Sequence, residues 1–410
     1  MKLRPVRGTH DLLSEDIKKY KFIYDLVSMK ANSQSFNELE TPIFEFSELF
    51  SKPLGEQSDV VLKEMYTFKD RGDEFLTLRP EYTTPMIRAA ITNNLLNDLP
   101  LKVYGLGPVF RRERPQKGRY RQFNQINFEI FGTDDYVADL ELIVLANDIL
   151  DTLIPKSEII LNINTLGQRS DLTKYKKILS KYFDDKKEKL SIESREKIYS
   201  NPLRILDSKN ENDIDISNNA PVIIDNISKE SKIHFDKLKK GLEFNNIDYE
   251  VNPKLVRGLD YYCETVFEFK TKNLGSQDTL IGGGRYDGLI KLLGGPDIPG
   301  IGWAAGIERI SLLMNLKKIS DKKVHLAIND KKFINHLLKI IKSLKDSNLP
   351  YFWNYKYNLK KSLSKANLDN AKFILIIGER EFENDNYTLR KLDTGEQFEI
   401  KINEINKYIQ

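Results

Sequence analysis

The strongest candidate for chemistry in this sequence is the stretch FRRERPQKGRYRQFNQINFEIFG, residues 110–132. Its first twelve residues contain five arginines and one lysine, and an alternating pattern typical of a strand follows. One face of that strand is predicted to be apolar, with Ile126, Phe128 and Ile130. The opposite face carries an aromatic ring, two amides and a carboxylate: Phe123, Gln125, Asn127 and Glu129. Such a polar wall on an apolar sheet is costly unless a ligand or an ion pair uses it.

The strand that precedes the basic loop also favours a ligand site. Alternation places Gly105, Gly107 and Arg111 on one face, so that two glycines beside an arginine leave space for a bound molecule. A simpler interpretation is that Arg111 forms a structural ion pair with Glu113 or Glu129. The basic loop likewise has two interpretations, because it could be a solvated turn or a surface for the phosphate backbone of a nucleic acid.

Two glycine-rich motifs offer further room for a ligand. GIGWAAGIERISLL, residues 300–313, places Arg309 where a small-residue strand with one nearly bare face meets a helix. IGGGRYDGL, residues 281–289, offers backbone amides for close approach, although close packing between strands would also explain its glycines. Because the sequence contains no GxxxxGK(S/T) loop, arginines would have to bind any nucleotide phosphates, as bidentate clamps.

Two more motifs place charged residues between apolar flanks. In LRPEYTTP, residues 78–85, the structural alternative for Glu81 or Thr83 is the capping of a helix. In VRGLDYY, residues 256–262, the structural alternative for Arg257 is a salt bridge. Neither motif decides between structure and function when it is taken alone.

Length and composition bound the elements that must position these residues. A chain of 410 residues predicts two or three domains, and its net charge of +4 permits nucleic-acid binding without arguing for it. Cys263 is the only cysteine, which excludes an intramolecular disulfide and a zinc–thiolate site, and no metal-ligand spacing is present. The N-terminus lacks the apolar core of a signal peptide, and no stretch is long enough to span a membrane. We therefore expect a soluble, cytoplasmic protein without a membrane partner.

The order of predicted elements indicates an α+β protein. Antiparallel strands and flanking helices extend to about residue 320, interrupted by a strand break at Pro42 that suggests an edge or interface position. Residues 168–235 are rich in lysine, aspartate, asparagine and serine with helical spacing, which predicts an inserted helical piece. From residue 324 to residue 410 the pattern is that of a separate small α/β unit.

Taken in order, these motifs resemble those of the histidyl-tRNA synthetase family, within the class II aminoacyl-tRNA synthetases. FRRE and GIGWAAGIER are similar to the second and third class motifs, and the Pro42 region to the dimer-forming first one. RGLDYY and GGGRYDGL are similar to the histidine-specific pair of segments. The resemblance implies a class II catalytic domain over residues 1–320, an anticodon-binding domain over 324–410 and a homodimer. It also implies activation of L-histidine with ATP and Mg²⁺, followed by transfer of histidine to the 3′ end of tRNA(His).

The resemblance further implies roles for individual residues. Arg257 and Arg111 would be catalytic, both acting on the α-phosphate. The histidine-binding set would be Glu81, Tyr82, Thr83, Arg111, Gln125, Glu129, Arg257, Tyr261 and Tyr262. The ATP-binding set would be Arg111, Glu113, Phe123 and Arg309, with the ring of Phe123 stacked on adenine. The acceptor end of the tRNA would meet Arg114, Gln116 and Lys117 in the basic loop.

Two rival functions have different sequence signatures. A regulatory subunit of ATP phosphoribosyltransferase resembles the same catalytic body but usually lacks both the C-terminal module and the arginine of RGLDYY, and this chain has both. A general nucleic-acid scaffold would explain the basic loop but neither Glu81 and Glu129 nor the glycine-rich strand. The enzyme is therefore the favoured hypothesis.

Overall fold

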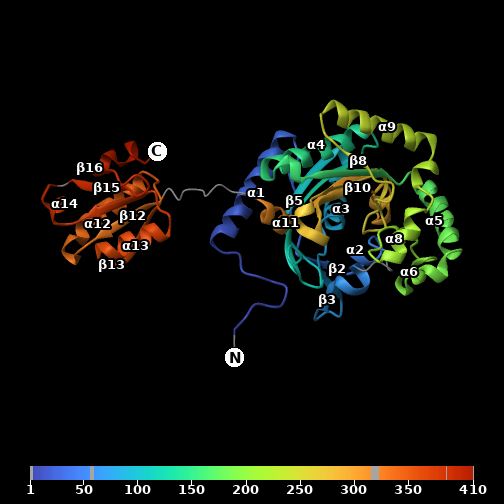
Figure 1. Cartoon of the computed structure of the whole chain (residues 1–410), viewed down its shortest axis with the longest axis horizontal. Coiled ribbons are helices and arrows are strands. Elements are labelled where there is room, and N and C mark those ends of the chain that lie inside the picture. Colours follow the sequence, from blue (N-terminus) through green and yellow to red (C-terminus); the bar gives the residue numbers. More distant parts are fainter. Residues whose placement is uncertain (1–2, 56–59, 315–322, 385, 410) are drawn as a thin grey trace. The chain divides into compact units, whose positions relative to one another are not determined.

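The computed structural model describes residues 3–55, 60–314, 323–384 and 386–409. The chain divides into two compact units, Met1–Asn315 and Leu316–Gln410 (Figure 1). The boundary predicted between residues 320 and 324 falls largely on residues outside those described. Each unit has its own sheet and its own buried core.

The first unit is built on a sheet of eight strands, as the motif order predicted. Their order is β1 (Asn37–Glu38), β5 (Leu101–Phe110), β6 (Gln122–Phe131), β11 (Gly300–Gly306), β10 (Thr279–Arg285), β9 (Cys263–Lys270), β7 (Ile160–Thr165) and β8 (Glu250–Val251). The six central strands pair antiparallel, and the two-residue edge strands pair parallel. The long β5–β6 hairpin therefore lies beside β11 and β10, the strands that carry the glycine-rich motifs.

One face of the sheet packs on helices through the predicted apolar residues. Ile126, Phe128 and Ile130 are at most 1% exposed, as predicted for the apolar face of β6, and Asn127 and Glu129 on the opposite face are buried as well. Helix α4 (Tyr136–Leu153) packs against β10 and β11, and Trp303 donates from its indole nitrogen to the Leu142 carbonyl at 3.1 Å. Helix α1 (Ser14–Ser33) contacts α4 and α11 (Ile307–Leu313), which covers the end of β6.

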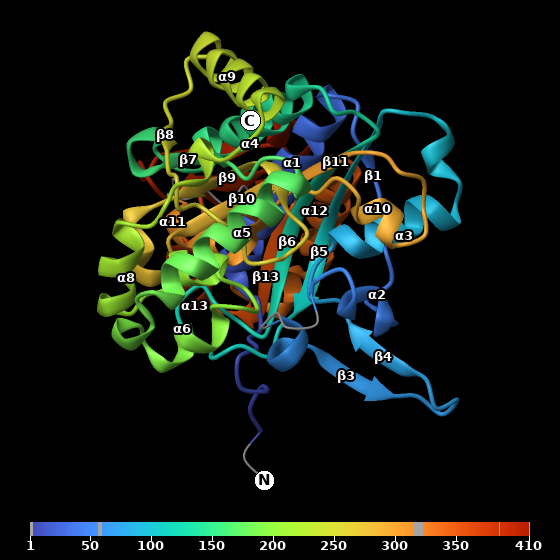
Figure 2. The same ribbon diagram turned by 90° about the vertical axis from the view of Figure 1, so that its right-hand side faces the viewer.

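A small antiparallel sheet accompanies the main one. It contains β2 (Phe44–Phe46), β4 (Phe75–Leu78) and β3 (Tyr66–Lys69), followed along the chain by helix α3 (Thr83–Thr92). Pro42 lies between β1 and β2, so the predicted interruption of the strand is present. Figure 2 shows the β3–β4 hairpin extending from the body of this unit. Helix α2 (Glu48–Ser51) packs between β2 and α3.

Helices fill most of the chain between β7 and β8. They are α5 (Arg169–Asp184), α6 (Ile192–Lys197), α7 (Leu203–Leu206), α8 (Glu211–Asn218) and α9 (Lys229–Phe244). The predicted end of this insertion at residue 235 is nine residues short of the end of α9, because Leu238 and Leu242 continue the buried face of that helix. The first four helices share a core that includes Leu179, Phe183, Ile198 and Ile205.

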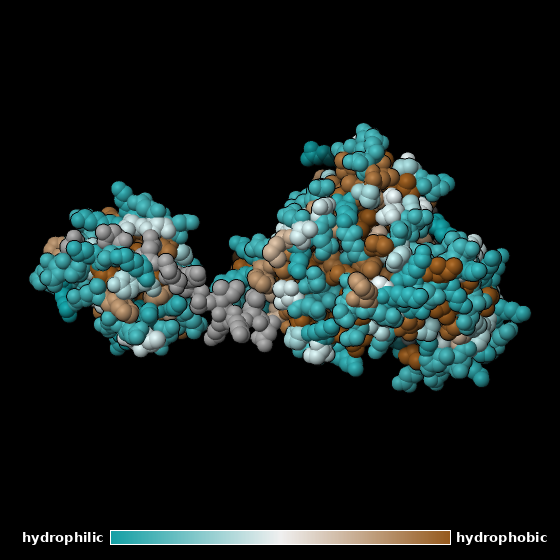
Figure 3. Space-filling model, turned by 90° about the horizontal axis from the view of Figure 1, so that it is seen from above, coloured by the Kyte–Doolittle hydropathy of each residue, from teal (hydrophilic) through white to brown (hydrophobic). Residues whose placement is uncertain are grey.

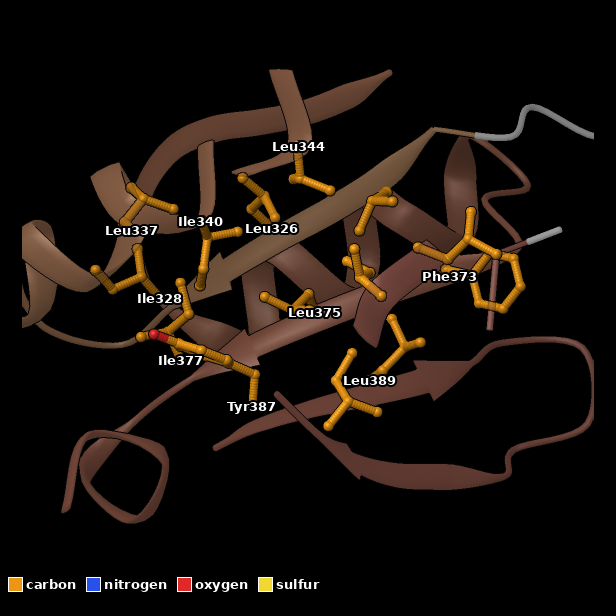
Figure 4. Close-up of a cluster of buried hydrophobic side chains, with 14 of the residues drawn as sticks. Leu326, Ile328, Leu337, Ile340, Leu344, Phe373, Leu375, Ile377, Tyr387 and Leu389 are labelled. Carbon is orange, nitrogen blue, oxygen red and sulfur yellow. The ribbon is translucent and has the colours of Figure 1, made fainter. Parts of the chain in front are cut away.

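The second unit is a five-stranded α/β domain, in agreement with the pattern of its sequence. The strand order is β13 (Tyr351–Tyr357), β12 (Val324–Ile328), β14 (Phe373–Ile377), β15 (Tyr387–Lys391) and β16 (Gln397–Ile400). Helices α12 (Ile334–Asp346), α13 (Leu359–Leu368) and α14 (Glu379–Asn384) connect them. Leu326, Leu337 and Leu375 meet in its core (Figure 4).

The surface of each unit is dominated by polar residues, with apolar ones scattered among them on the visible face (Figure 3). Within the described ranges, the chain contains no helix that is both long enough and apolar enough to cross a membrane.

A buried ion pair ties β10 to α4. Arg285, at the end of β10, and Asp139 on α4 are both fully buried, and Arg285 also donates to the carbonyls of Thr133 and Asp135 at 2.9 and 2.8 Å. We predict that Arg285→Met lowers the free energy of unfolding by about 3–5 kcal/mol, because it removes the guanidinium partner of a buried carboxylate and leaves it only the contact with His234 at 3.2 Å. The double variant Arg285→Met/Asp139→Leu should lose less. Urea unfolding followed by circular dichroism measures both, and equal losses in the two variants would contradict this account.

Candidate functional site

A cavity in the first unit brings together most of the residues that the sequence singled out. Ten of them line it: Glu81, Thr83, Arg111, Glu113, Phe123, Gln125, Arg257, Tyr261, Tyr262 and Arg309. They come from the turn before α3, the β5–β6 hairpin, the loop before β9 and the start of α11. These elements lie far apart in the chain and meet because β5, β6, β11, β10 and β9 are neighbours in one sheet.

The floor of the cavity is the polar face of β6 and β11. Gln125 is paired in register with Gly306, and Phe123 with Val109 on β5. A side chain at Gly306 would meet nothing within 4 Å, so the face is open there. At Gly302 it is filled, because a Cβ atom would lie 1.5 Å from Glu129 Oε2. The predicted bare face of β11 is therefore open only towards its C-terminal end.

Glu129 is held in a closed, hydrogen-bonded corner. Thr83 Oγ1 donates to its Oε1 at 2.7 Å, and the Tyr286 hydroxyl donates to Oε2. Burial, with a smaller contribution from the nearby Glu81, raises the pKa of Glu129 to about 8. The two hydrogen bonds oppose this rise. The group thus changes protonation close to neutral pH, and it can either donate a hydrogen bond or accept one.

Three tyrosine rings surround this corner. The ring centroids of Tyr261 and Tyr262 are 4.6 Å apart, and that of Tyr286 lies 5.7 and 6.4 Å from them. The sequence motifs predicted Tyr261 and Tyr262 as site residues, and Tyr286 was missed. The only available signal was its place in the GGGRYDGL motif, because no periodicity indicates which side chain reaches a carboxylate across the sheet.

Two predicted histidine-binding residues have structural partners here. Glu81 accepts hydrogen bonds from the amides of Thr83 and Thr84 at 2.8 and 2.9 Å, so it caps α3 while it also faces the cavity. Tyr82 is fully buried against Gly105 and Gly107, and its hydroxyl accepts a hydrogen bond from Arg79. A core side chain thus fills the space that the two glycines leave, and the predicted role of Tyr82 in binding histidine is not supported.

Three arginines crowd one end of the cavity. Arg111 Nε donates to the Pro80 carbonyl at 2.8 Å, and its guanidinium lies 5.7 Å from the Phe123 ring centroid. Arg309 donates to the carbonyls of Gly118 and Thr279 at 3.1 and 2.8 Å. Its pKa is lowered by burial and by the neighbouring Arg119 and Arg111. Like charges held together in this way favour a bound anion.

The proposed ion pair of Arg111 is not formed between the described residues. Glu113 pairs with Arg119, and both Glu129 oxygens accept from neutral hydroxyls. Arg119 itself lines the cavity and was missed as a site residue, since a loop has no periodicity from which the direction of a side chain can be read.

The guanidinium of Arg257 lies against the sheet at Gly282 of β10. Its Nη1 is 3.3 Å from Glu268 Oε1, so the salt bridge considered as its structural alternative is present. Gly282 makes this position possible, because a Cβ atom there would lie 2.0 Å from Nη2. The side chain nevertheless lines the same cavity as Arg111 and Arg309.

The basic loop divides into two parts. Backbone hydrogen bonds between Gln116 and Arg119, at 3.1 and 2.9 Å, close a tight turn. Arg114, Gln116 and Lys117 are exposed to solvent, whereas Arg119 reaches into the cavity. The predicted tRNA-binding residues therefore stand next to the cavity rather than inside it.

An arginine-rich cavity on an antiparallel sheet, in a chain that also carries a small α/β domain, is the architecture expected of a class II aminoacyl-tRNA synthetase. A family model described as histidyl-tRNA synthetase matches residues 8–310, and one described as an anticodon binding domain matches residues 322–410. The chain belongs to the histidyl-tRNA synthetase family.

Individual relatives agree over almost the whole chain. It is 45% identical over 400 residues to the histidine–tRNA ligase of Ehrlichia chaffeensis, covering 97% of this chain and 96% of that one. It is 41% identical over 417 residues to the histidine–tRNA ligase of Orientia tsutsugamushi, covering 100% and 99%. The crystal structure of apo Staphylococcus aureus histidyl-tRNA synthetase superposes with a TM-score of 0.82, at 30% identity and full coverage of both chains.

The raised pKa of Glu129 predicts a pH effect on stability. Between its ordinary pKa near 4.5 and about 8, the folded protein holds a proton that the unfolded chain releases. The contribution to stability is therefore complete below pH 4.5 and is lost as the pH rises towards 8, by up to about 1.4 kcal/mol per pH unit. In urea unfolding at pH 5 and pH 8, the wild type should lose more stability than Glu129→Gln. The exposed Glu15→Gln serves as the control, and identical pH dependence in all three would contradict the raised pKa.

Proposed function

We infer that this chain is a histidine–tRNA ligase, which activates L-histidine with ATP and transfers the histidyl group to the 3′ end of tRNA(His). The observation that supports this best is the polarity of the cavity. At one end, Tyr261 and Tyr262 line the cavity near the buried carboxyl group of Glu129, which lies over Gly302 and is not itself part of the lining; at the other end, Arg111, Arg119 and Arg309 line it. The end with the tyrosines suits an imidazole ring, and the end with the arginines suits the carboxylate of an amino acid beside the phosphates of ATP.

The histidine would lie with its ring towards Glu129. The carboxyl group and a tyrosine hydroxyl can together satisfy both imidazole nitrogens, and Tyr262, which lines the cavity from the loop before β9, is the candidate for the hydroxyl. Gln125 and Glu81 would bind the α-amino group, because both offer oxygen acceptors on the cavity wall. Arg111 would hold the carboxylate of the substrate beside the α-phosphate of ATP.

Adenylate formation requires positioning and charge neutralisation. A carboxylate oxygen of histidine attacks the α-phosphorus, and the bond from that phosphorus to the β-phosphate oxygen breaks to release pyrophosphate. Arg111 and Arg257 neutralise the charge that develops at the α-phosphate, and Arg309 lies beyond them for the outer phosphates. The ring of Phe123, which faces Arg111, offers a stacking surface for adenine.

Magnesium would enter with ATP. The described residues contain no group of three or more histidine, cysteine, aspartate or glutamate side chains placed to hold a metal ion. Phosphate oxygens would therefore supply most ligands, and Glu113, which lines the cavity beside the arginines, is a carboxylate that could add another. The ion would add positive charge at the outer phosphates.

The other partners of the enzyme would be tRNA(His) and a second copy of the chain. The exposed Arg114, Gln116 and Lys117 would guide the acceptor end, and the second unit would bind the anticodon. The small sheet exposes Phe44, Phe46 and Phe68, which share one face of it, by 45–55%, and a second copy would cover this apolar face in a homodimer. We place this enzyme in the cytoplasm, where its tRNA substrate is used.

The first prediction of this function concerns pyrophosphate exchange. The purified protein should exchange pyrophosphate into ATP with histidine and with none of the other amino acids. Arg257→His should lower the rate about 100-fold or more, because it removes a fixed positive charge from the transition state. Circular dichroism confirms that the variant is folded. Histidine binding without exchange by the folded wild type would instead favour the regulatory-subunit hypothesis.

The second prediction concerns the basic loop. The double variant Arg114→Ala/Lys117→Ala should leave histidine-dependent exchange unchanged and reduce kcat/KM for aminoacylation of tRNA(His). The salt dependence of tRNA binding should also become weaker, because fewer phosphates are neutralised. Unchanged aminoacylation at several salt concentrations would make the loop a solvated turn.

A further inference from the structure

The position of Arg257 depends on an irregular loop. Residues 252–262 connect β8 to β9, and none of them belongs to a helix or strand. The loop carries Arg257 as well as Tyr261 and Tyr262, so it supplies one whole wall of the cavity. Because no strand ladder fixes this wall, other contacts must hold it in place.

Two side chains of the helical insertion hold the loop directly after Arg257. Arg204, on α7, donates from Nη2 to the carbonyl of Gly258. Asn201, just before α7, donates to Asp260 Oδ1 at 2.8 Å. Gly258 is the next residue after Arg257, so the bond from Arg204 fixes the peptide group that joins Gly258 to Leu259, one residue beyond the Cα atom of Arg257.

A third side chain of the insertion reaches the other histidine-specific segment. Arg169, the first residue of α5, donates from Nε to the Asp287 carbonyl at 2.9 Å. Its guanidinium packs against Gly288, which has a φ of +86° and where a Cβ atom would lie 3.1–3.3 Å from it. Asp287 follows Tyr286, whose hydroxyl holds Glu129. The insertion therefore contacts the supports of both ends of the cavity.

The insertion is suited to act as a rigid support. Its core residues Leu179, Phe183, Ile198 and Ile205 are fully buried. That core also extends to Leu255 in the loop. Between the two parts a small cavity remains, lined by Leu203, Arg204, Leu259 and Asp260 among others. Since packing there is incomplete, the polar contacts of Asn201 and Arg204 determine how the peptide at Gly258 is oriented.

We propose that the helical insertion positions the active site, with Arg204 and Asn201 orienting the Arg257 loop and Arg169 orienting the turn after Tyr286. These are positioning residues, which act through Arg257 and Tyr286 without touching the substrates. The proposal rests on the proposed function, because it concerns how Arg257 is presented to the α-phosphate. It assigns a role in adenylate formation to the helical insertion, although none of its described residues lines the cavity.

The test compares two arginines of the insertion. Arg204→Met removes the contact with the loop. Arg195→Met is the matched control, because Arg195 on α6 donates to the carbonyls of Leu190 and Glu188 at 3.0 and 2.7 Å, within the insertion. In histidine-dependent exchange, Arg204→Met should lower kcat about 10- to 100-fold, since small misplacements of catalytic groups have effects of this size. KM for ATP should change by less than about threefold, and Arg195→Met should remain close to wild type in both.

Two further measurements separate positioning from general stability. Arg204→Lys keeps a donor for the Gly258 carbonyl and should recover part of the lost rate. Amide hydrogen exchange of residues 253–262 should speed up in Arg204→Met and stay unchanged in Arg195→Met. If Arg204→Met proves poorly folded, Asn201→Ala replaces it, with the same expected direction.

Three results would overturn the proposal. The first is a normal kcat in Arg204→Met, and the second is an equal loss in Arg195→Met, which would indicate a general effect of the insertion's stability. The third is unchanged hydrogen exchange in the loop. Absence of exchange activity in the folded wild type would overturn the proposed function instead, and hydrogen exchange would still show whether the insertion holds the loop.

Discussion

The arrangement of this site depends on one steric constraint: charged side chains can lie flat on the sheet only where the neighbouring strand has no Cβ atom. Glu129 occupies the space over Gly302, and Arg257 occupies the space over Gly282. Any larger residue at either position would push the charged group away from the sheet. The two glycines, on the adjacent strands β10 and β11, thus allow Arg257 and Glu129 to lie side by side over one surface.

The two ends of the cavity differ in their electrostatic character. Burial keeps Glu129 protonated near neutral pH against the opposing effect of its hydroxyl partners, whereas Arg111, Arg119 and Arg309 concentrate positive charge at the other end. An arginine cluster of this kind is unfavourable by itself, and a phosphate-bearing substrate relieves the repulsion. The protein therefore stores, in the unliganded fold, the charge arrangement that ATP and an amino acid would complete.

Long-range supports hold this arrangement in place. The Arg285–Asp139 pair joins β10 to α4, and the insertion contacts the loops beside Arg257 and Tyr286. The residues proposed to perform chemistry thus lie on strands or short loops, and residues remote in sequence contact those loops. The helical insertion, which resembled a polar appendage in sequence, belongs to this framework.

The sequence by itself determined the two-unit organisation, the polar and apolar faces of β6 and ten of the residues that line the cavity, because periodicity and the motifs that carry the family resemblance are local properties of the chain. It could not show that Tyr82 fills the space left by Gly105 and Gly107, or that Tyr286 reaches Glu129. It also could not choose between Arg111 and Arg119 as the partner of Glu113. Only the tertiary structure decided these points, because each depends on which side chains meet across strands that are distant in the chain, and no local pattern encodes that meeting.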